Sequence, residues 1–258
     1  MRYFVALLLA LTLAAEGSAA VRTQLVPYKH GEVSLEGYLA WNDSVKGKRP
    51  GVLVVHEWWG RNAYVEKRAR QLADLGYVAL AVDMYGKGLV TDDANKAGEL
   101  SGQFKKDVPL GRARINRALE VLKADPKVDG NRIAAIGYCF GGTTVLELAR
   151  SGAPVLGVVS FHGGLSTPNP EDARNIKGRL LVLAGGDDPF VPPAQVNAFE
   201  DEMRNAKVDW QLVSYGGAQH SFTNPDVDRY KLKGAVYDRK ADHRSWDEMK
   251  RFLADLFR

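Results

Sequence analysis

The sequence contains little sulfur: a single cysteine, Cys139, and four methionines among 258 residues. One cysteine cannot form an internal disulfide, which excludes the disulfide-stapled class of small exported domains. The chain also lacks a phosphate-binding loop, a G-x-G-x-x-G pattern after its first strand, and the closely spaced His and Cys pairs of metal sites. We therefore expect chemistry that uses neither a metal nor a cofactor.

Charge of one sign is not concentrated anywhere along the chain. The net charge is +4, but the 35 basic residues are scattered among 31 acidic ones, and no dense basic stripe or nucleic-acid motif is present. We expect a solvated, mildly basic surface and no nucleic-acid partner. The composition, 45% hydrophobic and 26% charged, is that of an ordinary globular domain.

Long hydrophobic runs are absent except near the start. Arg2 precedes an apolar run from Phe4 to Ala15, which is too short to span a bilayer, and Ser18-Ala19-Ala20 offers small residues for cleavage. We predict a signal peptide over residues 1–20, export to the periplasm or beyond, and no membrane attachment after cleavage. A retained anchor is the alternative. The remainder, 21–258, is predicted to form one domain.

Short apolar runs alternate with amphipathic stretches along the rest of the chain. This order favours an α/β fold, with a mostly parallel central sheet, helices on both faces and an antiparallel hairpin at one N-terminal edge. The predicted strands are 24–28, 33–41, 51–56, 77–82, 132–137, 155–161, 179–184 and 209–214, and the helices are 64–75, 93–104, 110–123, 141–150, 193–205 and 244–257. In such sheets, sites lie at the carboxyl ends of the strands.

The lone cysteine lies between a predicted strand and a predicted helix, in the pattern Gly137-Tyr138-Cys139-Phe140-Gly141. A nucleophile on a sharp strand-to-helix turn needs glycines beside it, because larger side chains would collide there. The helix dipole would favour the thiolate, and the N–H of Phe140 could hold an oxyanion. An inert buried thiol is the competing interpretation.

An acid and a base follow the nucleophile in the chain order of an α/β-hydrolase triad. Either Asp187 or Asp188, after the strand at 179–184, could be the acid, and His220, after the last strand, is the candidate base. The other histidines are His30, His56, His162 and His243. His56 and His162 also follow strands and could line the site.

These motifs resemble those of the dienelactone hydrolases, which are carboxymethylenebutenolidase-like enzymes with an α/β-hydrolase fold. The resemblance rests on Gly137–Gly142, on Asp188-Pro-Phe-Val-Pro192, on His220-Ser-Phe222, on His56-Glu-Trp-Trp-Gly60 and on Asp83-Met-Tyr-Gly86. It favours Asp188 over Asp187, because the family's aspartate precedes Val-Pro by the same spacing. It implies a cofactor-independent hydrolase that cleaves a small carboxylic ester or enol-lactone through Cys139, His220 and Asp188.

The resemblance also implies supporting roles. Glu57 would hold the resting thiol protonated and activate it on substrate binding, and the N–H of Trp58 would be a second oxyanion donor beside that of Phe140. We further expect a substrate pocket walled by aromatic and imidazole side chains. The expected wall residues are Trp59, Tyr85, Phe161 and His162, with Trp58 beside them.

One departure concerns substrate charge. Familiar members of the family place a carboxylate-binding arginine soon after the histidine motif, where this chain has Thr223-Asn224-Pro225. Arg61, Arg112 and Arg114 are possible substitutes, and the substrate need not be a dienelactone.

The class of function also has alternatives. A ligand-binding protein without catalysis and a thiol redox protein remain open, whereas a serine-type peptidase usually needs an additional domain. We expect a monomer or small homo-oligomer.

Overall fold

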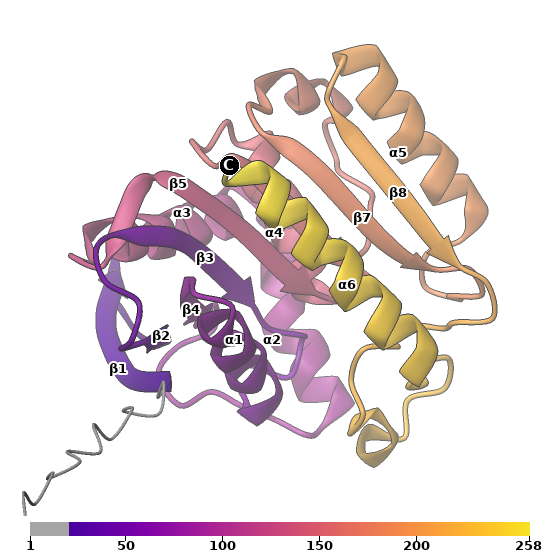
Figure 1. The fold of residues 1–258 in the computed structure, drawn as a ribbon. Coiled ribbons are helices and arrows are strands. Elements are labelled where there is room, and N and C mark those ends of the chain that lie inside the picture. The colour runs from indigo at the N-terminus through magenta and orange to yellow at the C-terminus, as the bar shows by residue number, and fades with distance from the viewer. Residues whose placement is uncertain (1–20) are drawn as a thin grey trace, which may run out of the picture.

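The chain forms one eight-stranded sheet whose N-terminal edge is a long hairpin (Figure 1). The computed structural model describes residues 21–258, so the predicted signal peptide lies outside the described residues. Strands β1 (Val21–His30) and β2 (Val33–Asn42) pair in antiparallel register from Val21 opposite Asn42 to His30 opposite Val33. The predicted edge hairpin is therefore confirmed.

The other strands run parallel to one another in the order β4-β3-β5-β6-β7-β8, and β2 joins β4 in antiparallel register. Their bounds are β3 Arg49–Val55, β4 Val78–Val82, β5 Val128–Tyr138, β6 Gly157–Phe161, β7 Arg179–Gly185 and β8 Trp210–Tyr215. The central strands are buried along nearly their whole length, because helices cover both faces.

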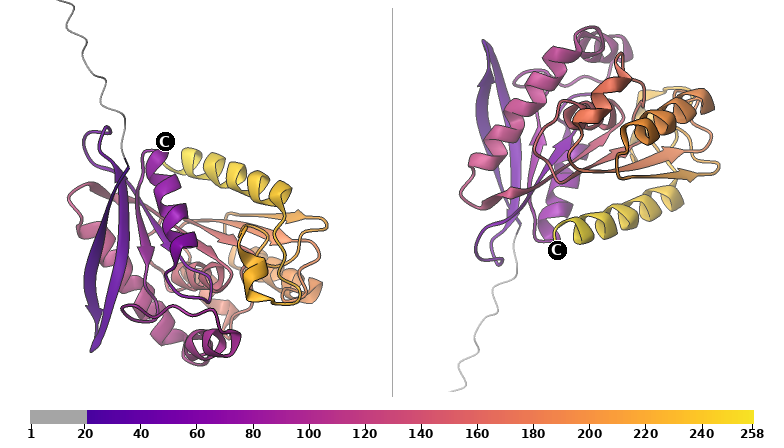
Figure 2. Two further views of the ribbon diagram at one scale, coloured as in Figure 1. Left: turned by 90° about the horizontal axis from the view of Figure 1, so that it is seen from below. Right: turned by 90° about the horizontal axis from the view of Figure 1, so that it is seen from above.

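Two layers of helices enclose this sheet (Figure 2). Helices α1 (Ala63–Asp74) and α6 (Arg239–Leu256) pack on one face, and α3 (Val108–Ala124), α4 (Phe140–Arg150) and α5 (Pro193–Ala206) pack on the other. Helix α2 (Ala94–Lys106) lies beside α3. The predicted α/β architecture is confirmed.

Helix ends follow local capping chemistry that the hydrophobic pattern did not reveal. Helix α6 begins at Arg239, earlier than predicted, because the Asp238 side chain accepts a hydrogen bond from the Ala241 N–H. Two short 3₁₀ helices, η1 (Pro170–Asn175) and η2 (Val227–Tyr230), were not predicted; both lie in connections that border the site. Within residues 21–258, no helix is both long and apolar enough to cross a membrane.

Candidate active site

The polar residues singled out by the sequence gather at one edge of the sheet, where the parallel strands end. Glu57 follows β3, Cys139 follows β5, Asp188 follows β7 and His220 follows β8. The structure therefore places these four residues at the carboxyl ends of the parallel strands, where sites are expected in such sheets.

The turn around Cys139 is strained and tightly packed. Cys139 has φ 52°, a left-handed value that a non-glycine residue rarely adopts. A Cβ atom on Gly137 would lie 2.0 Å from the Gly141 carbonyl oxygen, and one on Gly141 would lie 2.3 Å from the Val55 carbonyl oxygen. The two glycines therefore allow the turn to press against β3, which sets Cys139 at the N-terminus of α4.

Three side chains from separate strand ends form a connected chain of contacts. The Cys139 Sγ lies 3.0 Å from His220 Nε2, and His220 Nδ1 lies 2.7 Å from Asp188 Oδ2. Asp188 is buried and also accepts the Phe190 N–H at 2.8 Å, whereas the neighbouring Asp187 is exposed. The geometry thus selects Asp188 from the two aspartates.

The charge state of His220 depends on this chain. Burial lowers the pKa of His220, but the adjacent Cys139 sulfur and the contact with Asp188 outweigh burial, so its pKa is raised above the ordinary value. The imidazolium form is therefore stabilised next to a sulfur atom. A thiolate and an imidazolium at this spacing are the pair that a thiol nucleophile needs.

Glu57 is buried after β3, and its side chain is hydrogen-bonded to Asn224 and not to the Cys139 sulfur. Its Oε2 accepts a hydrogen bond from Asn224 Nδ2 at 2.6 Å, while its Oε1 has no partner. Burial raises the pKa of Glu57, and the polar side chains of Ser221 and Asn224 oppose that rise. Asn224 is a residue that sequence reasoning missed; its only signal was that it stands where an arginine was expected.

Two backbone amides are free to face a substrate oxygen. Phe140 is the first residue of α4, so its N–H has no acceptor within the helix. Among residues 21–258, neither Phe140 nor Trp58 donates its backbone N–H to another protein group. Both residues line the same cavity as Cys139.

The cavity above Cys139 has a volume of about 700 Å³ and a largely apolar wall. Large side chains from several elements face it: Trp58, Phe104, Phe140, Phe190 and Leu232. Helix α2 contributes a stripe of small residues ending in a lysine: Gly98, Ser101, Gly102 and Lys105. A volume of this size suits a small organic substrate.

The predicted aromatic wall differs from the observed one. Trp59 stacks on Tyr230 with ring centroids 3.8 Å apart, and Phe161 stacks on Tyr138 in the core. Tyr85 is buried and donates its hydroxyl to the Trp58 carbonyl. These three residues and His162 lie outside the cavity lining, so the wall prediction is wrong for them; only Trp58 lines it.

The arginines considered as carboxylate ligands are engaged elsewhere. Arg61 pairs with Glu36 and Glu66, and Arg114 contacts His30 and the Met84 carbonyl. Arg112 pairs with Glu147 and Asp172. None of the three lines the cavity, where Lys105 is the cationic residue.

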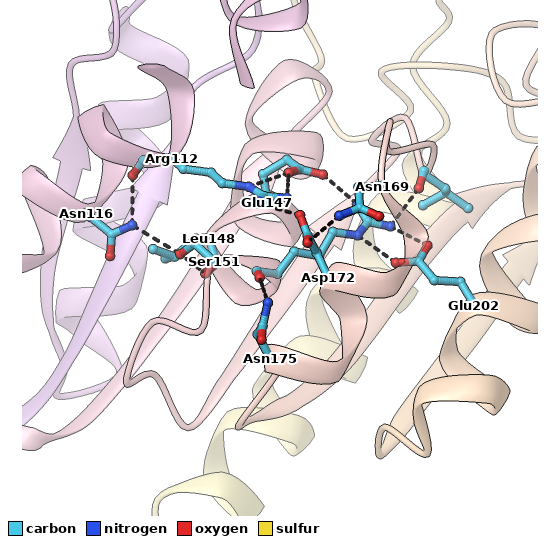
Figure 3. Close-up of polar contacts among 11 residues, drawn as sticks. Arg112, Asn116, Glu147, Leu148, Ser151, Asn169, Asp172, Asn175 and Glu202 are labelled. Atoms are coloured by element: carbon cyan, nitrogen blue, oxygen red, sulfur yellow. Dashed lines mark hydrogen bonds and ion pairs between the residues drawn. The ribbon is translucent and has the colours of Figure 1, made fainter. Parts of the chain in front are cut away.

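Arg112 belongs to an ion cluster that supports one cavity wall. Figure 3 shows Arg112, Glu147 and Asp172 directed at one another, with Glu202 at the far end of the cluster. Arg150 is almost fully buried and lies 2.9 Å from Glu147 and 2.7 Å from Glu202.

The same cluster holds the backbone that follows β6. Arg150 donates to the Leu165 carbonyl at 2.9 Å, and Gln195 accepts the Leu165 N–H at 2.7 Å. Arg150 and Gln195 therefore hold the Leu165 backbone, whose neighbours in the segment 164–168 form part of the cavity wall. It also neutralises Glu147, the carboxylate in that wall.

Within residues 21–258, no group of three or more His, Cys, Asp or Glu side chains is arranged to hold a metal ion. His56, which the sequence left as a possible site residue, is buried beneath Phe140, and burial lowers its pKa to about 4. A buried neutral imidazole that accepts the Met84 N–H has a structural function.

A strained strand-to-helix turn that carries Cys139, an aspartate and a histidine after later strands, and a cavity above them are the arrangement expected of an α/β-hydrolase, and the fold is that of this class. A family model described as "Dienelactone hydrolase family" matches residues 35–257. The chain belongs to the dienelactone hydrolase family, whose members are hydrolases acting on ester and lactone bonds.

Known proteins resemble the chain over most of its length. A dienelactone hydrolase-like promiscuous phosphotriesterase from metagenomic libraries is 43% identical, with a TM-score of 0.90 over 93% of this chain and 100% of that one. Dienelactone hydrolase from Anabaena variabilis is 22% identical, with a TM-score of 0.64 over 89% and 98% of the two chains, and so supports the fold alone. Protein usf of Aquifex pyrophilus is 27% identical over 205 residues, covering 78% of this chain and 87% of the relative.

Proposed function

We propose that the protein hydrolyses small esters or lactones through a Cys139 thioester intermediate. The observation that carries this proposal is the pair of contacts from sulfur to His220 Nε2 at 3.0 Å and from His220 Nδ1 to Asp188 Oδ2 at 2.7 Å. The pair lies at the floor of an apolar cavity of about 700 Å³.

The reaction begins when the substrate carbonyl oxygen is placed against the N–H groups of Phe140 and Trp58. The Cys139 thiol proton passes to His220 Nε2 and the sulfur attacks the carbonyl carbon, with Asp188 stabilising the imidazolium. The C–O bond then breaks, and His220 returns the proton to the leaving alcohol or enol. His220 next removes a proton from water, which attacks the thioester, and the acid departs as Cys139 is reformed.

A thiolate is itself easily expelled from a tetrahedral intermediate. Activated esters and enol-lactones, which have good leaving groups, should therefore react faster than simple alkyl esters. Glu57, buried and with a raised pKa, is proposed to regulate the protonation of the nearby thiol. For this role the Glu57 carboxylate would have to separate from Asn224, with which it is hydrogen-bonded in this structure.

The first test is hydrolysis of 4-nitrophenyl acetate and a panel of enol-lactones by residues 21–258, with and without Cys139→Ala. We expect kcat/KM to fall by about 10³-fold or more in the variant. Full activity of the variant would overturn the proposal. If neither protein turns over any substrate while iodoacetamide still labels Cys139, a binding or thiol redox function becomes the better explanation.

A neutral phosphotriester is a second candidate substrate. The metagenomic relative is described as a promiscuous phosphotriesterase and is 43% identical. The cavity here offers apolar walls and no arginine, which suits an uncharged triester with a good leaving group. Release of 4-nitrophenol from diethyl 4-nitrophenyl phosphate, abolished by Cys139→Ala, would support this activity; release that persists in the variant would refute it.

We also propose that residues 1–20 direct export, since the leader has the composition of a signal peptide. N-terminal sequencing of protein recovered from a periplasmic fraction should begin near Val21. Recovery of an uncleaved chain in the membrane fraction would favour the retained anchor instead.

A further inference from the structure

A chain of buried polar side chains connects the turn that carries Cys139 with the loop that carries His220. Its members are His162, which follows β6, Thr223, which follows His220 in the same loop, and Tyr64 of α1. All three are buried, and none lines the cavity. The reaction described above uses none of them.

His162 contacts both loops with its two ring nitrogens. The Cys139 N–H donates to His162 Nδ1 at 3.1 Å, and His162 Nε2 lies 2.8 Å from Thr223 Oγ1. Because Nδ1 must accept from an amide, the ring proton is on Nε2 and donates to Thr223. Burial lowers the pKa of His162 well below its ordinary range, so this neutral tautomer persists.

Thr223 is in turn held by two side chains of α1. Its hydroxyl lies 2.6 Å from the Tyr64 hydroxyl, and its carbonyl accepts a hydrogen bond from Arg68 at 2.8 Å. Arg68 is buried and pairs with Asp242 at 2.5 Å. These contacts fix the loop after β8 at Thr223. His162 then joins Thr223 to the Cys139 backbone through its two ring nitrogens.

Both ends of this link have unusual backbone geometry. Cys139 has φ 52° and His162 has φ 40°, and such left-handed values persist in non-glycine residues only when neighbouring contacts maintain them. The Cys139 N–H makes two such contacts, to the Phe161 carbonyl at 3.0 Å and to His162 Nδ1 at 3.1 Å.

We propose that His162 and Thr223 are positioning residues that set the distance between Cys139 Sγ and His220 Nε2. The proposal builds on the proposed function, but it concerns a pairing that can be measured without a substrate. Because neither residue lines the cavity, loss of the link should lower kcat and leave KM nearly unchanged.

The test compares Thr223→Val, which keeps the shape and removes the hydroxyl, with Thr223→Ser, which keeps the hydroxyl. We expect Thr223→Val to lower kcat by about 10- to 100-fold with KM within about twofold, since small displacements of catalytic groups cost this much. Thr223→Ser should restore kcat to within about threefold of the wild type. Ser245→Ala, which removes a buried hydroxyl of α6, is the control for general destabilisation.

A second readout separates positioning from folding. The rate at which iodoacetamide alkylates Cys139 is measured from pH 5 to 9, where the imidazolium keeps the thiolate reactive at low pH in the wild type. In Thr223→Val the profile should move toward that of His220→Ala, whereas Ser245→Ala should keep the wild-type profile. A Thr223→Val protein with wild-type kcat, or with a lowered melting temperature and an unchanged profile, would overturn the proposal.

Where Thr223→Val does not fold, His162→Asn decides the question. Asparagine tolerates a left-handed backbone and can still accept the Cys139 N–H, but it cannot reach Thr223. It should reproduce the expected loss of kcat and shift of the alkylation profile, and unchanged values of both would overturn the proposal. If the wild type shows no turnover that depends on Cys139, the proposed function fails, and the alkylation profiles still test the link.

Discussion

The two halves of the candidate site are built in different ways. The proposed reacting groups, Cys139, Asp188 and His220, lie at the ends of parallel strands, and contacts of 2.7–3.1 Å fix their positions. Much of the cavity wall comes instead from α2, from the segment 164–168 and from Leu232, which lie in connections outside the sheet, although Trp58, Phe140 and Phe190 near the strand ends also face the cavity.

The difference separates chemistry from selectivity. The hydrogen-bonded sheet fixes the strand ends relative to one another, so a change there should affect every substrate. The wall contains Gly102, at which an added Cβ would meet no other atom within 4 Å, and an exposed lysine. Changes in the wall should therefore favour some substrates over others and leave the chemical step intact.

After substitution of Cys139 itself, the largest expected effect is that of Asp188→Asn. The asparagine amide would donate to His220 Nδ1 and force the ring proton onto Nε2, where it cannot accept the thiol proton. We expect kcat/KM for 4-nitrophenyl acetate to fall by at least about 100-fold. The exposed neighbour gives a matched control, and Asp187→Asn should stay within about twofold.

The same variant has a pH signature. Asp188 and the Cys139 sulfur both raise the pKa of His220, so removing the Asp188 charge lowers that pKa. The imidazolium is then lost at a lower pH, and alkylation of Cys139 by iodoacetamide at pH 6 should slow. An equal loss of activity in Asp187→Asn and Asp188→Asn would remove the distinction between them.

Sequence patterns predicted where the strand-end residues of the candidate site lie in the fold. The positions of Cys139 and His220, and of the aspartate pair 187–188, follow from short apolar runs and from glycines that the turn requires, and both signals are local in the chain. The choice of Asp188 over Asp187 rests on the resemblance to dienelactone hydrolases. The hairpin edge and the parallel sheet followed from the same runs.

The wall could not be predicted in this way, because its partners are distant in sequence. Trp59 and Phe161 follow or end strands, as true site residues do, but Tyr230 and Tyr138 cover them. No local pattern marks Tyr230, which belongs to an unpredicted 3₁₀ helix. The contact between Glu57 and Asn224 likewise joins residues far apart in the chain.

A medium effect is expected for Gly102→Leu on α2. The Cβ has room, and leucine has a higher helix propensity than glycine, so the fold should tolerate the change. The longer side chain would occupy cavity volume, so kcat/KM should fall by about tenfold for 4-nitrophenyl octanoate and change little for the acetate. Gln103→Leu, exposed on the same helix, is the control. An equal loss for both esters would contradict a wall that acts only on selectivity.

The smallest expected effect concerns the charge of the wall. Glu147 is neutralised by Arg112 and Arg150, whereas Lys105 forms no ion pair with any group in residues 21–258, so the cavity carries one uncompensated positive charge. An exposed charge acts weakly and is screened by salt. We expect Lys105→Gln to lower kcat/KM for the 4-nitrophenyl monoester of succinate by about threefold at low ionic strength, and not at 0.5 M salt.

Two controls test whether this effect comes from the charge in the cavity. The neutral isostere, 4-nitrophenyl 4-methylpentanoate, should react equally with the wild type and with Lys105→Gln. Lys106→Gln, next in the chain and outside the cavity lining, should change neither rate, and a loss as large as that of Lys105→Gln would assign the effect to the general surface charge.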